Sequence, residues 1–296
     1  MLTDLPLVTI VTPSFNQAEF LEETILSVLR QDYPNIEYII IDGGSSDNSV
    51  EIIKKYENRL AYWISESDNG QTDAIIKGFS KAKGQYITWL CSDDILEPST
   101  ISLSVAFLQR YSEAVLTFGN RVRIDSKGNI TAVSRKGSFY KWCLKLGLTL
   151  PQETVLIRRS DYDKSDGLDA SLNMAMDFDL WCKLLKLGPF IHIPAYLGRF
   201  RTHSANKSHI YSKQLKETGY NSGNPSEVLL TMRKHFGISP SKYKLKLGLK
   251  MYQASSFAER RRKSYREKLN LVNQIKKYGY PVHSSSFPIP SKKRDG

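Results

Sequence analysis

Two adjacent carboxylates, Asp93 and Asp94, follow a dense apolar run at residues 86–90 and come shortly before Pro98. The run is too continuously apolar for a strand with one wet face, so it predicts a buried, parallel strand of an α/β sheet. Ligands of open α/β sheets bind just beyond such strand ends. Divalent cations take carboxylate oxygens and keep positions open for phosphate, so this pair could join a metal ion to a phosphate. Turn chemistry and solvation explain an Asp pair in a loop just as simply.

Three earlier apolar runs, at residues 7–11, 37–42 and 60–64, also end in polar or acidic residues. Helical spacing of apolar residues after each run predicts helices between the strands. Repeated strand, turn and helix units favour right-handed parallel α/β layers, with ligand chemistry in the loops after the strands. Asp and Asn are common in turns because their side chains hydrogen-bond the local backbone. This explains a single polar residue after a strand well, but it explains poorly why every one of these strands ends in such residues.

The pattern after residue 98 is less regular. Asp177 falls in the first turn of a predicted helix at 174–185, where the positive end of the helix dipole favours an anion. The other predictions are helices at 98–111 and 139–148, strands at 115–118, 121–124 and 154–157, an antiparallel return at 130–133, and a closing strand at 191–201.

The formal charge of +12 over 296 residues is unevenly distributed. Residues 1–204 hold 22 Lys and Arg against 25 Asp and Glu, whereas residues 205–296 hold 20 against 5. The basic character therefore belongs to the C-terminal part, and nucleic-acid binding by the main domain is not expected. A solvated helix face explains these cations, and attraction to an anionic membrane surface is the alternative, worth on the order of 1 kcal/mol per cation.

The chain has no apolar run of about 18 residues and no basic stretch followed by an apolar core at its start. We therefore expect a cytoplasmic protein, with peripheral attachment at the inner face of the membrane as a further hypothesis. The three cysteines are odd in number and far apart, which predicts buried thiols and no disulfide framework.

Four motifs in order resemble the family 2 glycosyltransferases of the GT-A fold: VTIVTPSFN (8–16), IIDGGSSD (40–47), SESDNGQTD (65–73) and WLCSDD (89–94). The resemblance implies a Rossmann-like, mostly parallel central α/β sheet flanked by helices over residues 1–204. A basic, largely helical C-terminal extension is expected over residues 205–283, followed by a disordered tail at 284–296.

The resemblance also implies a nucleotide site. It puts Pro13, Ser14 and Phe15 against the nucleotide, with the ring of Phe15 near the base. Asp42 is then expected to accept a hydrogen bond from the base or ribose, and Glu66 and Asp68 to close the same pocket.

The donor diphosphate is expected near Asp73, Asp93 and His203, and Asp93 and Asp94 fall in the family's metal motif for Mn²⁺ or Mg²⁺. A cation there stabilises the negative charge that develops on a leaving nucleoside diphosphate. Cys91 stands where an Asp is frequent in this motif, so the two aspartates are expected to hold the metal alone.

MDFDLW (176–181) corresponds to the family's acidic motif and makes Asp177 the expected general base, with Asp179 as second choice. A carboxylate that simply begins a helix is the structural alternative for Asp177. The implied reaction is a one-step displacement with inversion, from a nucleotide-diphosphate sugar, a UDP-sugar first, to a hydroxyl of a glycan or lipid-linked glycan in cell-surface polysaccharide or lipopolysaccharide synthesis. Gln-x-x-Arg-Trp, the mark of processive members, is missing from the sequence, so we expect a single addition.

Two other classes of protein stay open. A nucleotidyltransferase of similar architecture needs a Gly-rich basic loop after the first strand, where this chain has TPSFN (12–16). A nucleotide-sugar-binding protein without turnover has only Cys91 in its favour. Asp94→Asn separates an enzyme, which loses turnover, from a binder, which changes only its metal-dependent affinity.

Overall fold

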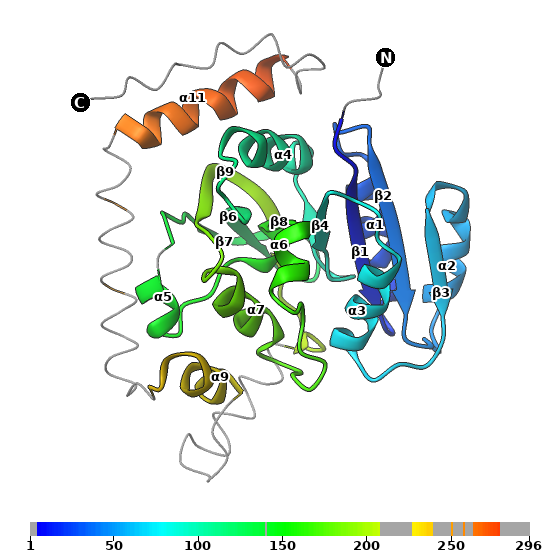
Figure 1. Cartoon of the computed structure of the whole chain (residues 1–296). Coiled ribbons are helices and arrows are strands. Elements are labelled where there is room, and N and C mark those ends of the chain that lie inside the picture. The colour runs from blue at the N-terminus through cyan, green and yellow to red at the C-terminus, as the bar shows by residue number, and fades with distance from the viewer. Residues whose placement is uncertain are drawn as a thin grey trace, which may run out of the picture.

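The computed structural model describes residues 5–139, 141–207, 227–238, 250, 257 and 263–278. Its centre is one sheet with the strand order β3-β2-β1-β4-β8-β6-β9-β5, and β7 pairs with β6 beside this path (Figure 1). Helices lie on both faces of the sheet. This is the predicted α/β architecture.

The first half of the chain alternates strands and helices as the apolar pattern predicts. Its four strands run parallel, because a helix after each of the first three returns the chain to the edge where the strands begin. The elements are β1 (Val8–Ser14), α1 (Ala18–Leu29), β2 (Ile36–Asp42), α2 (Ser49–Lys55), a 3₁₀ turn (Glu57–Arg59), β3 (Tyr62–Ser65), α3 (Gln71–Lys81) and β4 (Tyr86–Trp89).

The register of these strands aligns their carboxyl ends. Ser14 of β1 lies opposite Asp42 of β2, and Asp42 lies opposite Ser65 of β3. Leu90, just past β4, donates its N–H to the carbonyl of Val11 at 2.9 Å. The polar residues that follow the four strands therefore gather along one edge of the sheet.

The second half of the sheet is mixed. β8 runs antiparallel to β4 and β6, β6 runs parallel to β9, and β7 and β5 run antiparallel to their partners. The elements are β5 (Ile95–Leu96), α4 (Thr100–Arg110), β6 (Leu116–Ile124), β7 (Ile130–Ser134), α5 (Lys141–Lys145), a 3₁₀ turn (Gln152–Thr154), β8 (Leu156–Arg158), α6 (Arg159–Lys164), α7 (Met176–Leu184) and β9 (Phe190–Arg201).

Two apolar clusters cover the two faces of the sheet. Ile25 of α1, Ile53 of α2 and Val105 of α4 pack on one face. Phe79 of α3 and Trp181 of α7 pack on the other. The indole of Trp181 stacks on that of Trp89 in β4 with ring centroids 5.9 Å apart, so α7 packs against the strand that leads into residues 91–94.

The strands predicted at 115–118 and 121–124 form one continuous strand, β6. Gly119, which suggests a break in the sequence, serves close packing instead, since a Cβ there would lie 2.4 Å from Leu197. β9 also runs through Pro194, where its pairing with β6 shifts register between Phe118 and Asn120. β5 and α6 have too few residues for a periodic signal and were not predicted.

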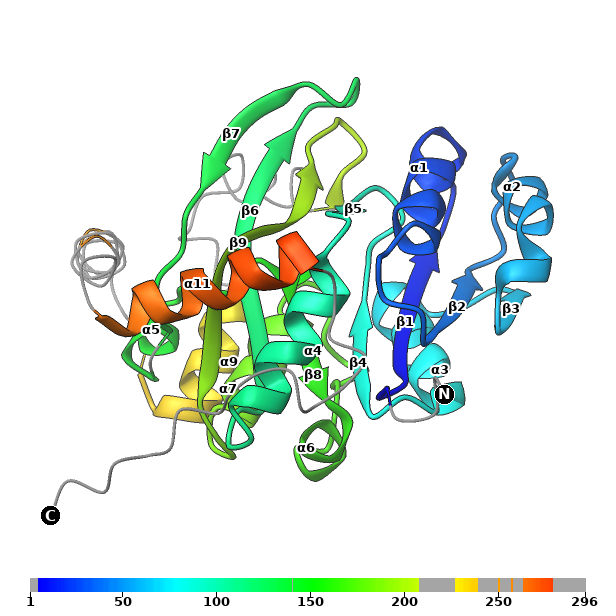
Figure 2. The same ribbon diagram turned by 90° about the horizontal axis from the view of Figure 1, so that it is seen from above.

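Two helices from beyond residue 204 complete the described structure, α9 (Glu227–Phe236) and α11 (Lys263–Tyr278). Met232 of α9 is fully buried in the cluster that contains α7. Ile275 of α11 is fully buried, and α11 packs on α4 and β9 (Figure 2). The domain boundary at 204 stays a prediction, and the tail at 284–296 lies outside the described residues. None of the helices in the described part of the chain has the length and apolar character that crossing a bilayer requires.

Candidate active site

A cavity of about 780 Å³ opens at the edge where the parallel strands end. One wall comes from the loops after β1 and β4 and from the start of α3. The rest of the lining comes from β6, the 149–153 segment, the start of α7 and the 205–207 segment. The two halves of the sheet therefore meet at this cavity.

Four residues predicted to bind the nucleotide line the cavity together: Pro13, Ser14, Phe15 and Asp68. The ring of Phe15 is 59% exposed, which is unusual for a large apolar side chain and leaves its face free to stack on a flat ligand. The roles of these residues stay predictions.

Asp42 is fully buried beneath this wall. Its carboxylate accepts hydrogen bonds from the backbone N–H of Ser45 at 2.9 Å, the hydroxyl of Ser45 at 2.6 Å and the hydroxyl of Ser65 at 2.7 Å. The same carboxylate thus ties the loop after β2 to the end of β3, next to Gly43, which lines the cavity.

Glu66 and Asp73 both turn toward Lys77 of α3. The Lys77 ammonium lies 3.1 Å from Glu66 and 3.5 Å from Asp73. Asp73 also accepts the backbone N–H of Asn69 at 3.0 Å, and this hydrogen bond is the main cause that lowers its pKa. Through these contacts the two carboxylates hold Lys77 and the backbone before α3 in place.

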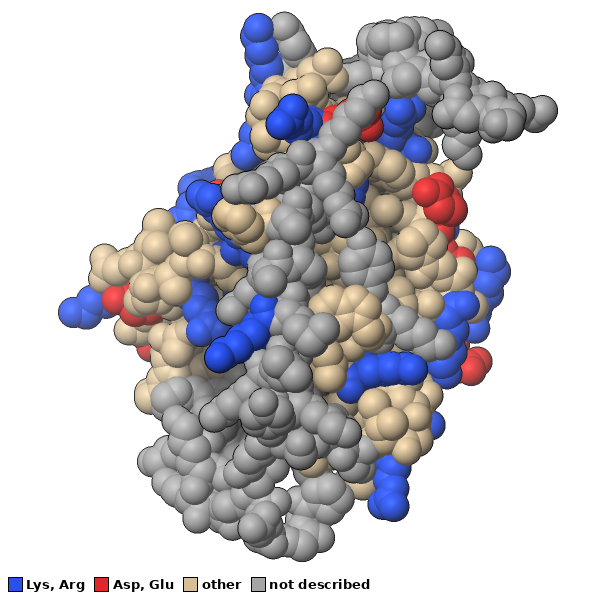
Figure 3. Space-filling model, turned by 90° about the vertical axis from the view of Figure 1, so that its left-hand side faces the viewer, with Lys and Arg blue, Asp and Glu red and all other residues tan. Residues whose placement is uncertain are grey.

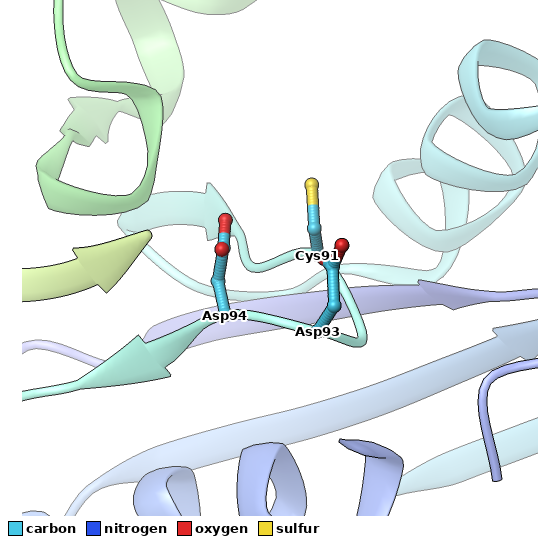
Figure 4. A group of neighbouring side chains, drawn as sticks. All are labelled: Cys91, Asp93 and Asp94. Carbon is cyan, nitrogen blue, oxygen red and sulfur yellow. The ribbon is translucent and has the colours of Figure 1, made fainter. Parts of the chain in front are cut away.

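Cys91, Asp93 and Asp94 point to the same side of the loop between β4 and β5 (Figure 4). One thiol or carboxylate atom from each lies within 4.8 Å of the others. Burial, followed by the nearby charges of Asp93 and Glu153, raises the pKa of Asp94 well above its usual value. Two crowded carboxylates and a thiol suit a divalent cation, which would offset their mutual repulsion.

Each aspartate of this group is oriented by donors behind it. Asp93 accepts hydrogen bonds from the His203 ring at 3.0 Å and from Asn206 at 3.2 Å, and Asp94 accepts the backbone N–H of Arg201 at 3.0 Å. His203 therefore lies beside Asp93, and its ring packs on Phe20 with centroids 4.6 Å apart, while its role at the donor diphosphate stays a prediction.

Arg201, which sequence reasoning missed, holds this loop from below. Its guanidinium is 1% exposed, donates to the carbonyl of Asp93 at 2.9 Å and pairs with Glu23 at 2.5 Å. The hydroxyl of Thr24 donates to the carbonyl of Asp94 at 2.8 Å. A sequence offers no signal for contacts between residues so far apart.

Asp177 lies in the first turn of α7 and lines the same cavity as Asp93 and Asp94. Burial raises its pKa to about 6, against the opposing effects of the Phe178 backbone N–H and the charge of Arg121. A carboxylate with this pKa is ionised at neutral pH and is a better base than an ordinary aspartate.

Asp179 has a different environment. It is fully buried and accepts contacts from Lys183 at 2.8 Å, His235 at 2.7 Å and Lys234 at 3.2 Å. Burial alone would raise its pKa, but hydrogen bonds from His235 and Lys183 hold that pKa well below the usual range. Asp179 therefore joins α7 to α9, which argues against it as a base.

The sequence did not predict two further sets of contacts at the site. Arg121 of β6 and Glu153 form a two-point ion pair on the cavity wall, with Nε and Oε1 2.6 Å apart. Glu227 of α9 accepts the backbone N–H groups of Asn173, Met174 and Ala175, at 3.1, 2.6 and 2.9 Å, just before α7 begins.

Comparison with known proteins shows which protein family the chain belongs to. Residues 9–166 match the family model "Glycosyl transferase family 2". An uncharacterised glycosyltransferase of Rickettsia typhi is 30% identical over 220 residues, which cover 72% of this chain and 69% of the relative. Chondroitin synthase of Escherichia coli is 25% identical over 240 residues, or 80% of this chain and 34% of the synthase.

Solved structures show the same GT-A architecture. TarS of S. aureus, in complex with UDP-GlcNAc, superposes with a TM-score of 0.58 at 16% identity over 79% of this chain and 73% of TarS. A mannosyltransferase of Pyrobaculum calidifontis, in complex with GDP-Man and Mn²⁺, gives 0.54 at 15% identity over 95% and 89%.

Proposed function

The chain belongs to glycosyl transferase family 2, and from this we propose that it moves one sugar from a nucleotide-diphosphate sugar to a hydroxyl of a glycan or lipid-linked glycan, with inversion. The observation that carries the proposal is that Asp93, Asp94 and Asp177 line one cavity. In this proposal Asp93 and Asp94 would be ligands for a cation, and Asp177, whose pKa is raised, would be the base. A UDP-sugar is the first donor to test, and synthesis of cell-surface polysaccharide or lipopolysaccharide is the proposed setting.

Asp93 and Asp94 would hold Mn²⁺ or Mg²⁺, which supplies positive charge to the donor diphosphate when bound. The known structures that the fold matches include one with Mn²⁺, and the donor set here fits such an ion. His203 and Asn206 both donate to the same oxygen of Asp93 and fix its orientation, which leaves the other oxygen for a cation.

Asp177 accepts the proton of the acceptor hydroxyl as that oxygen attacks the anomeric carbon and the nucleoside diphosphate leaves. Asp177 lines the same cavity as Asp93 and Asp94, and a single inverting displacement would place the sugar between the attacking and leaving oxygens. The ionised form is the active one, so the rate falls as the pH falls through about 6.

The test is a binding and hydrolysis screen of UDP-, GDP-, dTDP- and CMP-sugars, with and without Mn²⁺. Wild type, Asp93→Asn and Asp177→Asn are compared. We expect one donor to bind wild type in a metal-dependent way and to be hydrolysed slowly. Asp93→Asn should lose metal-dependent binding, while Asp177→Asn should keep binding and lose hydrolysis. If none of the donors binds wild type, the proposal is wrong.

We also propose peripheral attachment to an anionic membrane. On the face shown in Figure 3, Lys and Arg side chains are scattered with few Asp and Glu among them. α11 contributes Arg266 and Lys276, both exposed, while its apolar face packs on the core. Such cations attract anionic lipid without inserting.

Deleting residues 225–296 is a poor test of attachment, because it also removes the buried Met232 and Ile275. Arg266→Gln combined with Lys276→Gln leaves those contacts in place. Sedimentation with liposomes containing phosphatidylserine should show weaker binding of the double variant than of wild type. Equal binding, or no binding by wild type, removes the membrane proposal and leaves the catalytic one untouched.

A further inference from the structure

Arg121 and Glu153 form an ion pair on the wall of the cavity, and the proposed reaction gives neither of them a role. Nε of Arg121 donates to Oε1 of Glu153 at 2.6 Å, and Nη2 donates to Oε2. These two contacts use one edge of the guanidinium group. The Glu153 side chain is 1% exposed and that of Arg121 is 19% exposed, so the arginine is the partner that a ligand in the cavity can reach.

The backbone of β9 leaves room for this pair. Gly198 is the register partner of Arg121, and a Cβ at Gly198 would lie 2.7 Å from Cγ of Glu153. A larger residue at 198 would therefore push Glu153 out of its place. Phe200, two residues further along β9, has its ring centroid 4.6 Å from Cζ of Arg121. An acid and an aromatic ring thus hold the guanidinium group in position before a ligand binds.

The second edge of the guanidinium group has no protein partner. Among the described residues, none accepts a hydrogen bond from Nη1 of Arg121, because its two hydrogen bonds come from Nε and Nη2. A partly buried donor costs free energy unless water or a ligand satisfies it. Nη1 is therefore a fixed donor at the cavity wall, and the charge of Glu153 balances the charge of the group that carries it.

One segment of the wall, residues 149–153, connects this ion pair with both the metal motif and the proposed base. The side chain of Thr149 hydrogen-bonds Asp177. Oε1 of Gln152 lies 3.9 Å from Sγ of Cys91, and Glu153 is the next residue in the chain. In the proposed reaction the transferred sugar lies between the metal-bound diphosphate and the base. The ion pair is therefore next to the place of that sugar.

We propose that Arg121 recognises the transferred sugar, with Nη1 donating a hydrogen bond to an uncharged oxygen of that sugar, a hydroxyl or the carbonyl of an acetamido group. The inference rests on the proposed function, since it assumes that the donor diphosphate binds at Asp93 and Asp94. Glu153 balances the charge of Arg121, so the contact suits a neutral oxygen better than a carboxylate. A site that hydrogen-bonds a substrate group discriminates strongly against a substrate without that group. Arg121 is thus a specificity-determining residue for the donor sugar.

The test separates binding of the sugar from binding of the nucleotide. The donor is the nucleotide sugar that binds wild type in the screen of UDP-, GDP-, dTDP- and CMP-sugars. Its dissociation constant in the presence of Mn²⁺ is compared by calorimetry with that of the same nucleotide without the sugar. The main variant combines Arg121→Met with Glu153→Met, because apolar residues of similar volume often replace a buried ion pair without loss of stability. This variant also leaves the net charge of the cavity unchanged.

Two further variants accompany it. Arg121→Lys keeps a cation for Glu153 and has no group in the place of Nη1. The control is Arg135→Gln, which changes an exposed arginine just after β7 whose Nε donates to the hydroxyl of Tyr196 at 3.1 Å. Thermal melting checks that each variant folds, and Arg121→Lys carries the test if the double variant does not fold.

We expect the double variant and Arg121→Lys to bind the nucleotide sugar on the order of tenfold more weakly than wild type, and to bind the nucleotide equally well. Arg135→Gln should bind both ligands as wild type does. An equal loss for nucleotide and nucleotide sugar would mean that the ion pair only supports the wall. Unchanged binding of both would mean that Arg121 does not contact the sugar. Either result overturns the inference and leaves the proposed function in place.

The identity of the donor is a second check. A donor whose sugar carries a carboxylate as its only recognised group would contradict the neutral contact at Arg121, and the protein would still be a glycosyltransferase. If none of the nucleotide sugars binds wild type, the proposed function is wrong, and the inference is refuted with it.

Discussion

The parallel half of the sheet and the mixed half contribute to one cavity in different ways. In the parallel half, each strand delivers its own polar residues, and close neighbours in the chain position them. Asp42 takes its hydrogen bonds from Ser45 and Ser65, 3 and 23 residues away. In the mixed half, Arg201 of β9 donates its backbone N–H to Asp94, 107 residues away, and Ala175 donates to Glu227 across 52 residues.

In the proposed function, the residues for the nucleotide of the sugar donor are thus held by short-range contacts, and those for sugar transfer and the acceptor are held by long-range contacts. The proposed nucleotide wall is a local product of strand ends and turns. The proposed base Asp177, its helix α7 and Arg121 of β6 depend on tertiary packing, including α9 from the C-terminal part of the chain. We therefore expect substitutions around α7 to affect turnover and stability more than substitutions of similar chemistry in the parallel half.

Asp177→Asn should give the largest effect on turnover. Removing a general base costs about 10²- to 10⁴-fold in rate, and we expect a kcat loss in this range with the donor dissociation constant unchanged. The wild-type rate should fall with decreasing pH below about 6, where Asp177 becomes protonated, and the variant should lack this limb. Donor hydrolysis measured from pH 4.5 to 9 checks both.

The stability of Asp177→Asn provides the control. The pKa of Asp177 is raised in the folded protein, so its charge opposes folding at neutral pH. The Asn variant should therefore be at least as resistant to urea as wild type at pH 7. A variant that is inactive because it is unfolded would leave the assignment of the base unsupported.

Asp179→Asn should give the largest effect on stability. It removes the anion that Lys183, Lys234 and His235 share at a fully buried position, and breaking a buried pair costs about 3 kcal/mol or more. Since the folded pKa of Asp179 is lowered, its contribution is present above the ordinary value of about 4 and is lost as the pH falls below it. Urea unfolding at pH 7 and pH 3 should show a gap between wild type and variant that narrows at pH 3, and a pH-independent gap would contradict this account.

Glu227→Ala should lower the kcat of donor hydrolysis on the order of tenfold, because its carboxylate fixes the backbone just before Asp177. Donor KM should hardly change, and Glu227→Gln, which keeps the accepting oxygen, should recover most of the rate. Glu51 is the matched control, an exposed glutamate in the first turn of α2 in the parallel half. Equal losses for Glu51→Ala and Glu227→Ala would show that α9 does not position the base.

The sequence predicts the parallel half almost completely, because strands, turns and amphipathic helices there follow one another at short range. The mixed half is predicted in its elements but not in its contacts. Gly119 suggested a break where close packing requires a glycine inside a strand, and the Asp177 and Asp179 pair could not be told apart without their neighbours. Arg121 with Glu153, and Arg201 behind Asp93, join residues whose separation leaves no local pattern.

Glu22→Gln should give the smallest effect on stability. It tests the comparison with an exposed ion pair in the parallel half of the sheet. Glu22 of α1 accepts the ammonium of Lys55 at 2.5 Å and the hydroxyl of Tyr56 at 2.6 Å, contacts as short as those of Asp179. Its side chain is 42% exposed, however, so water screens the charges and competes for the hydrogen bonds. We expect the urea midpoint to stay within experimental error of wild type at low and at high salt. A shift as large as that of Asp179→Asn would mean that contact geometry, and not burial in the mixed half, sets the strength of these ion pairs.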